Sequence, residues 1–315
     1  MSKKSILLVT HSQKKGYNRF FYGSQPSCPS FFLWIFLLTF PLFIATSAPV
    51  YAQWTMGAGG IAMGQAHTAD HRDAWAVFHN PAQISPHDFS AGFFSIRYYG
   101  LRELQDHAAF ISSPLPFAGE TFQAGIAAGL HTYGFELYRE TRMRSGFSLM
   151  VSGIRWGITV TYAHVQISDR PSVHHLLFDT GFSVPLSSSF VAAVRISNLL
   201  EKPASPSAGA SSALTENPNV PLFPQELAFG LQWLVFCHTR ILLDVVKDTL
   251  YPAMIRTGLE YSLMDGFLLR TGWTSRPFTW AAGFEVSFSS LSAEVAIQHH
   301  EILGYSPGIS CRISL

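Results

Sequence analysis

The sequence predicts an all-β protein, a transmembrane antiparallel β-barrel of about 14 strands with a small N-terminal plug segment. From about residue 90 to the C-terminus, apolar and polar residues alternate in many short runs, as in Trp280 to Phe288 and Ile309 to Leu315. This period of two gives each strand one apolar face. An export-type leader precedes these runs, and the links between them tend to alternate between short and long. Outer-membrane barrels combine all three features.

Residues 1–52 are predicted to be a signal peptide. Five basic residues and no acidic residue lie before Ala52, and Phe31 to Ala45 is strongly apolar. Val50 and Ala52 then place small residues at the −3 and −1 positions of a cleavage before Gln53. An uncleaved membrane anchor is the alternative, but Pro41 within the apolar run favours cleavage. A start codon downstream of Met1 is a further alternative.

Composition narrows the class of protein. Five of the 21 Lys and Arg residues precede residue 53 and none of the 20 Asp and Glu residues does, so the remainder is acidic by four charges. An acidic chain without a basic stripe argues against nucleic-acid binding. Charged residues make up 13% of the chain, against about 25% in soluble domains, yet no helix-length apolar segment follows residue 52. A membrane barrel fits this combination, and a soluble all-β protein is the alternative.

The chain after the leader divides into two parts. Residues 53–89 lack strand periodicity and are expected to pack inside or beneath the barrel mouth, with His71 to Pro81 as a short helix. Residues 90–315 are expected to form the outer-membrane β-barrel. Its links include two long ones, Tyr133 to Met143 and Leu199 to Leu222, and the second is expected to be a mobile external loop. The predicted strands are roughly 91–99, 106–113, 121–132, 144–151, 154–167, 174–185, 189–198, 223–236, 239–246, 252–263, 266–274, 277–288, 290–299 and 307–315.

Several short motifs resemble a known family. They are Gly57 to Gly64 (GAGGIAMG), His67-Thr68-Ala69, Asp73 to Ala76 (DAWA), Asn80-Pro81-Ala82 and Arg195 to Leu199 (RISNL). Together they resemble the mature start and barrel of PorV/PorQ-like outer-membrane proteins, within the FadL-like superfamily of fourteen-stranded barrels. The sequence departs from that pattern at Gln65, Gln83-Ile84 and the terminal Leu315. The resemblance implies a barrel that works in type IX protein secretion or transports hydrophobic molecules.

The candidate site is a plug or hatch within the barrel, formed by Gly57, Gly59, Gly60, Met63, Gly64, Asn80, Pro81 and Ala82. The glycines permit close packing in a narrow lumen. A phosphate-binding loop is disfavoured, because no strand precedes them and no basic residue follows closely. Pro81 cannot continue a helix and Asn80 tolerates a turn, so this pair is expected to lead the chain from plug to first strand.

Charged positions within the predicted strands are expected to face the lumen and to pair there, because a charge facing lipid is costly. They are Arg155, Arg195, Asp179, Glu226, Asp244, Arg256, Glu260, Arg270, Glu285 and Glu294. No catalytic residues, cofactor or metal site are predicted, and Cys237 and Cys311 suggest no disulfide framework. The pairs His174-His175 and His299-His300 are poor chelators, since neighbouring strand residues point to opposite faces.

Two functions follow as hypotheses, both at the outer membrane and in contact with its lipid. The first is a PorV/PorQ-like secretion component that contacts secretion-machine proteins or exported cargo, for which Leu199 to Leu222 is the candidate surface. The alternative is a FadL-like transporter of hydrophobic small molecules across the outer membrane. A purely structural barrel is a third. The transporter hypothesis expects an apolar lumen beside Gly57 to Gly64, and a lumen filled with paired charges would count against it.

Overall fold

The computed structural model describes residues 55–116, 122–200, 202–203, 223–236 and 238–315. The predicted signal peptide, residues 1–52, lies outside these ranges, as do Cys237 and most of the link between Leu199 and Leu222. Among the described residues, no helix has both the length and the apolar character needed to cross a membrane.

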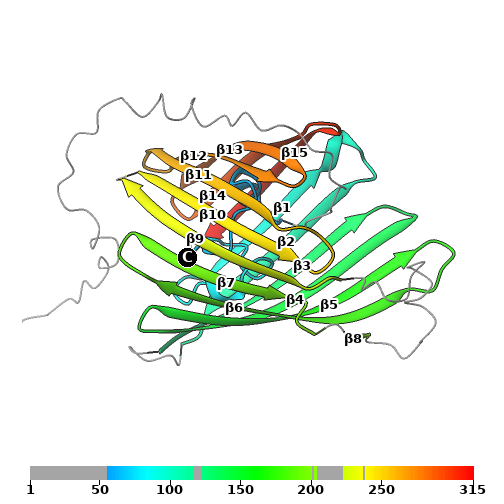
Figure 1. The fold of residues 1–315 in the computed structure, drawn as a ribbon, viewed down its shortest axis with the longest axis horizontal. Coiled ribbons are helices and arrows are strands. Elements are labelled where there is room, and N and C mark those ends of the chain that lie inside the picture. Colours follow the sequence, from blue (N-terminus) through cyan, green and yellow to red (C-terminus); the bar gives the residue numbers. More distant parts are fainter. Residues whose placement is uncertain (1–54, 117–121, 201, 204–222, 237) are drawn as a thin grey trace, which may run out of the picture. The chain divides into compact units, whose positions relative to one another are not determined.

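Fourteen antiparallel strands form a closed barrel, as the sequence predicts (Figure 1). Each pairs with the next along the chain, and β1 pairs with β15 from Ser90↔Ser314 to Ile96↔Gly308, so the wall has no free edge. The two-residue β8 (Lys202–Pro203) pairs with β6 near the start of that strand, at His175 and Leu176. The strands are β1 (Ser90–Arg97), β2 (Gln105–Pro114), β3 (Phe122–Gly134), β4 (Tyr138–Val151), β5 (Ile154–Ile167), β6 (Val173–Pro185), β7 (Phe190–Ser197), β9 (Glu226–Phe236), β10 (Thr239–Asp248), β11 (Met254–Met264), β12 (Phe267–Ser275), β13 (Phe278–Phe288), β14 (Leu291–His300) and β15 (Gly304–Ser314).

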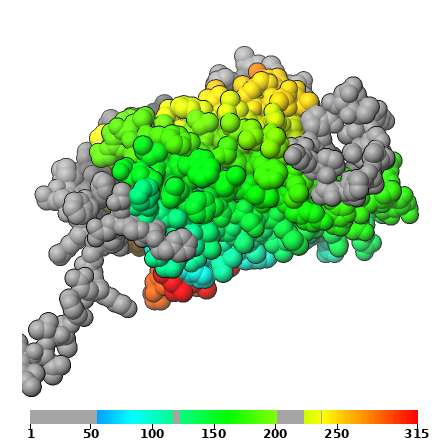
Figure 2. Space-filling model, turned by 90° about the horizontal axis from the view of Figure 1, so that it is seen from below, coloured from blue at the N-terminus to red at the C-terminus, as the bar shows by residue number. Residues whose placement is uncertain are grey.

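Apolar side chains cover the outside of the barrel and polar ones line much of its inside. On β5, Trp156 and Val160 are exposed, whereas the alternate Thr159 and Thr161 are buried. Figure 2 shows the outer face over β4 to β7 (green) as a continuous surface. This arrangement is the reverse of a soluble barrel. Closure of the sheet pairs neighbouring strands all round the wall, as a barrel in hydrocarbon requires. The barrel is therefore built to stand in lipid.

One predicted long link is wrong. β3 and β4 extend to Gly134 and Tyr138, so only residues 135–137 join them, instead of a loop from Tyr133 to Met143. The first half of β4 was missed because its inward positions hold Glu140, Arg142 and Arg144 rather than apolar residues. The charges repeat every second residue and still mark a strand. The links after β4, β9, β11 and β13 are two residues each, as expected for tight turns.

Residues 55–88, here named the lumenal segment, lie within the barrel (Figure 1). Their helix α2 (Ala58–Ala62) contacts β12 to β15, and the 3₁₀ turn η1 (Pro81–Gln83) contacts β4 to β6. The predicted helix over His71 to Pro81 is wrong, since this stretch is a series of turns. Asp70 accepts from the Arg72 amide and Asp73 from the Trp75 amide, both at 2.9 Å, and these side-chain bonds replace helical ones.

Candidate functional site: the barrel lumen

Glycines on both sides allow the lumenal segment to touch the wall. Gly64 has φ 61°, and a Cβ there would lie 2.4 Å from the Thr257 carbonyl oxygen and from the Trp273 nitrogen. On the wall, a Cβ at Gly272 would lie 2.2 Å from the Gly64 nitrogen, and one at Gly258 2.5 Å from the Met63 oxygen. Backbone therefore rests on backbone, and Met63 packs its side chain against Ala66 and Leu242.

The other predicted glycines are also at points of close approach. Gly57 has φ 84°, and a Cβ there would meet the Trp75 ring at 2.4 Å. A Cβ at Gly59 would meet the Arg270 guanidinium at 2.5 Å, whereas Gly60 has more room, with Thr55 at 3.2 Å. The Gly59 amide donates to Glu294 Oε2 at 3.2 Å. Here a wall carboxylate approaches the helix backbone because no side chain intervenes.

The Asn-Pro-Ala turn packs against two strand glycines. Asn80 Oδ1 accepts from the Ala82 amide at 3.1 Å, so Asn80 begins η1 with Pro81 at its first position; the pair starts a turn rather than ending a helix. The Asn80 side chain also donates to the Thr68 carbonyl at 2.6 Å. A Cβ at Gly157 would strike Pro81, and one at Gly181 would lie 1.8 Å from Asn80 Oδ1. The structure thus places all eight predicted site residues along the lumenal segment, in two groups at α2 and η1.

Wall side chains bind the backbone of the lumenal segment between these groups. Asp244 Oδ2 accepts from the amides of His67 and Thr68 at 2.9 Å and from the Thr68 hydroxyl at 2.8 Å. Three wall arginines donate to backbone carbonyl groups of the lumenal segment: Arg144 to Phe78 at 2.7 Å, Arg195 to His79 at 3.2 Å and Arg256 to Gln65 at 3.2 Å. Anchors on β4, β7, β10 and β11 hold the segment from several sides of the lumen.

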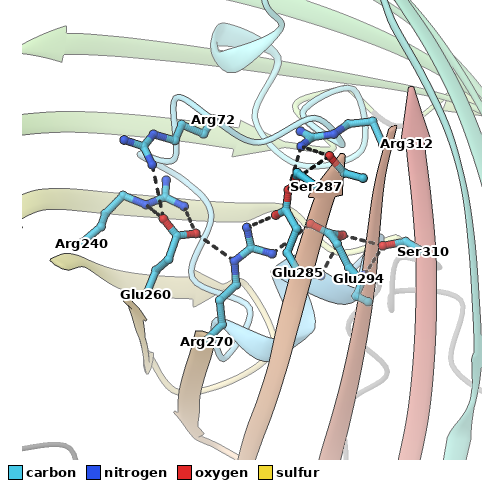
Figure 3. A network of polar contacts seen from close by, with 12 residues as sticks. Arg72, Arg240, Glu260, Arg270, Glu285, Ser287, Glu294, Ser310 and Arg312 are labelled. Atoms are coloured by element: carbon cyan, nitrogen blue, oxygen red, sulfur yellow. Dashed lines mark hydrogen bonds and ion pairs between the residues drawn. The ribbon is translucent and has the colours of Figure 1, made fainter. Parts of the chain in front are cut away.

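A balanced ion network covers the wall from β10 to β15 (Figure 3). Glu260 accepts from Arg240 Nη2 at 2.9 Å and from Arg270 Nε at 2.8 Å, and Arg270 continues to Glu285 at 2.5 Å and Glu294 at 2.9 Å. Its further members are Arg312, which binds Glu285, and Asp70 and Arg72 of the lumenal segment, which bind Arg240 and Glu260. Four arginines thus oppose four carboxylates, so the network as a whole carries no net charge.

The middle of the inner faces of β1 to β3 is apolar instead, between the buried Asp106–His131 pair toward one end and the Ser90–Ser112 pair toward the other. Phe94, Ile96, Ala108, Phe110 and Ala127 form one buried cluster with residues of the lumenal segment. Trp75 lies at its centre, with ring centroids 4.7 Å from Phe110 and 5.8 Å from Phe94. The lumen therefore has a charged wall on β10 to β15 and an apolar patch on β1 to β3, with the lumenal segment in contact with both.

Two histidines of the lumenal segment are held neutral. Burial, followed by repulsion from His79, Arg195 and Arg256, lowers the pKa of His67 well below its usual value, and the His67 ring stacks on His79 at 3.9 Å. Burial also lowers the pKa of His71 to about 4, and His71 Nδ1 lies 2.8 Å from Gln232 Oε1. His79 Nδ1 lies 2.6 Å from Asp73 Oδ2.

The predicted inward charges and the His pairs can be located directly. Of the predicted charges, Arg195 pairs with Glu226, and Glu260, Arg270, Glu285 and Glu294 belong to the network. The sequence did not single out Arg240, Arg312 or Arg144, although each occupies an inward position of its strand. In the described strands His174 and His299 point outward and His175 and His300 inward, which agrees with the prediction for both pairs. No group of three metal-ligating side chains occurs among the described residues.

Comparisons with known proteins identify the fold. No family model matches the sequence, and no curated protein matches it significantly. Among solved structures, the CymD monoaromatic hydrocarbon channel is similar with a TM-score of 0.57 at 13% identity, over 82% of this chain and 96% of that one. The Pseudomonas putida toluene transporter TodX is similar with a TM-score of 0.52 at 13% identity, over 82% and 96%. At this identity the likeness concerns the fold alone, a closed fourteen-stranded antiparallel barrel.

Proposed function

We propose that this protein is an outer-membrane channel for hydrophobic small molecules, with the lumenal segment as its plug. The observation that carries the proposal is an apolar lumen wall, Phe94 and Phe110 with their neighbours on β1 to β3, directly beside that segment. A hydrophobic molecule that crosses a polar leaflet needs such a surface. The fold shared with a toluene transporter and a monoaromatic hydrocarbon channel supports this choice.

The ion network bears on the same proposal. The sequence led us to expect that a lumen filled with paired charges would count against transport. The charges are indeed paired, both in the network on β10 to β15 and in further pairs such as Arg144–Asp179, Arg195–Glu226 and Asp106–His131. An apolar patch on β1 to β3 remains between them. The network neutralises itself and binds the lumenal segment through Asp70, Arg72 and Gly59. We infer that the charged wall positions the plug and the apolar wall contacts the transported molecule.

Uptake of radiolabelled toluene by cells that express the full chain tests the proposal. Phe94→Ser places a hydroxyl on the apolar wall, and Phe93→Ser makes the same change one residue earlier on the lipid-facing side. We expect uptake above that of cells without the protein. We also expect F94S to lower the uptake rate several-fold and F93S to leave it unchanged. Heat-modifiable migration on gels verifies folding of both variants. Uptake equal to that of cells without the protein, or equal effects of both substitutions, would refute the proposal.

The secretion hypothesis rests on the sequence resemblance alone. Its candidate surface, Leu199 to Leu222, lies largely outside the described residues, and the structural comparisons supply no secretion partner. Secretion measured in a deletion strain decides between the two functions: a loss of exported proteins with unchanged toluene uptake would favour the PorV/PorQ-like role.

A further inference from the structure

In the part of the wall that the structure describes, permanently charged outward side chains occur at one end of the barrel only. In the described strands, Arg97, Arg139 and Lys247 occupy outward positions, and all three are exposed. They adjoin the links 98–104, 135–137 and 249–253, which antiparallel pairing brings to the same end. Within the described strands, no Asp or Glu occupies an outward position, so the charge on the lipid-facing wall itself is purely basic. The adjoining links carry both signs, with Glu103, Glu136, Asp169 and Glu301 beside Arg102, Arg170 and Arg276.

Four outward-facing histidines lie at the same end of the wall as these cations, and the imidazole of each packs against another aromatic side chain. His107 stacks on Phe93 at 6.3 Å, His164 lies parallel to His174 at 4.6 Å, and His299 lies 5.3 Å from Trp280 and 4.5 Å from Tyr305. His174 also bonds the Tyr162 hydroxyl at 2.7 Å. Aromatic rings beside polar groups are typical of the boundary between hydrocarbon and headgroups. We name the three cations and four histidines the basic belt.

The opposite end of the outer wall differs. Its exposed outward side chains are apolar and include Ile154, Phe190, Phe236 and Phe288. The basic belt therefore contacts only one of the two membrane leaflets. The link 198–225, the longest in the barrel, belongs to the belt's end, and long links lie outside the cell in such barrels. The belt consequently faces the outer leaflet.

We propose that the basic belt binds the phosphate groups of a phosphorylated glycolipid of the lipid A class. Charge complementarity requires an anionic ligand, and the apolar wall directly below the belt requires that this ligand carry acyl chains. The belt draws residues from β1, β2, β4, β5, β6, β10 and β14, so it surrounds much of the barrel. A lipid shell can engage sites distributed in this way, whereas one docked protein would cover only a few neighbouring strands.

Binding of bisphosphorylated lipid A to the full chain in detergent, followed by native mass spectrometry, tests the proposal. The variant R97Q/R139Q/K247Q removes the three belt cations, and R102Q/R170Q/R276Q removes three exposed arginines from links at the same end. We expect the belt variant to bind at least about tenfold more weakly, because basic residues near a membrane surface attract anionic lipid headgroups. The link variant should change by less than about threefold.

Two further arms identify the ligand chemistry. Dephosphorylated lipid A should bind the wild type as weakly as bisphosphorylated lipid A binds the belt variant. Phosphatidylglycerol, a phosphate lipid without the glycolipid headgroup, should bind more weakly than lipid A. Equal loss in the belt and link variants, unchanged binding of dephosphorylated lipid A, or tighter binding of phosphatidylglycerol would each overturn the proposal. Heat-modifiable migration confirms that every variant is a closed barrel.

Discussion

Gly272 on β12 shows how one missing side chain positions the lumenal segment. Its substitution by Ala places a Cβ 2.2 Å from the Gly64 nitrogen. The atoms that this Cβ meets belong to the backbone, so a change of side-chain rotamer cannot remove the clash. We expect Gly272→Ala to lower the free energy of unfolding by about 1–3 kcal/mol, measured by urea titration in detergent. Gly308→Ala is the matched control, because its Cβ would meet only atoms at 3.6 Å. Equal midpoints for the two variants would contradict the packing argument.

Asp244 makes three of the hydrogen bonds that attach the segment to the wall. One carboxylate oxygen accepts three hydrogen bonds from His67 and Thr68 within a buried site. Asp244→Ala leaves these donors unsatisfied, and we expect a loss of roughly 2–5 kcal/mol in unfolding free energy. The exposed turn residue Asp265 provides the control, since Asp265→Ala should change stability by less than about 0.5 kcal/mol. Hydrogen exchange of residues 55–88 reports whether the segment itself is released.

At the scale of elements, the period of two predicted the wall well and the lumenal segment poorly. Strands such as β5 and β13 alternate Trp and Val with Arg, Thr and Glu, and two faces in different surroundings enforce that alternation. The segment obeys no period, because its turns follow from individual contacts such as Asp73 to Trp75 and Gly64 to Gly272. Its glycines and Asn80-Pro81 could be singled out, but their partners on the wall, such as Gly272 for Gly64 and Gly157 for Pro81, lie more than 70 residues away and have no local signature.

The lumenal segment as an element should respond to pH through His67. The pKa of His67 in the folded protein lies well below the value of about 6.5 expected when unfolded. The unfolded state therefore takes up a proton first as pH falls, so stability is complete above about pH 6.5 and is lost progressively below it. Urea midpoints between pH 7.5 and pH 5 should fall for the wild type and fall less for His67→Gln. His238→Gln, at an exposed turn, should retain the wild-type slope, and identical slopes in all three proteins would contradict this role.

For the whole molecule, closure in lipid makes the cost of a charge depend on its depth. Val295 lies in the middle of β14 and points outward, whereas Ile313 points outward near the end of β15; both are exposed. In a bilayer, Val295→Arg should destabilise the barrel by about 2–4 kcal/mol and Ile313→Arg by about 0–1 kcal/mol, because water and headgroups reach only the rim. Urea unfolding in phospholipid vesicles measures both. A soluble barrel would tolerate either arginine equally on its exposed surface, so indistinguishable stabilities would contradict the membrane-spanning wall on which the channel and the basic belt both depend.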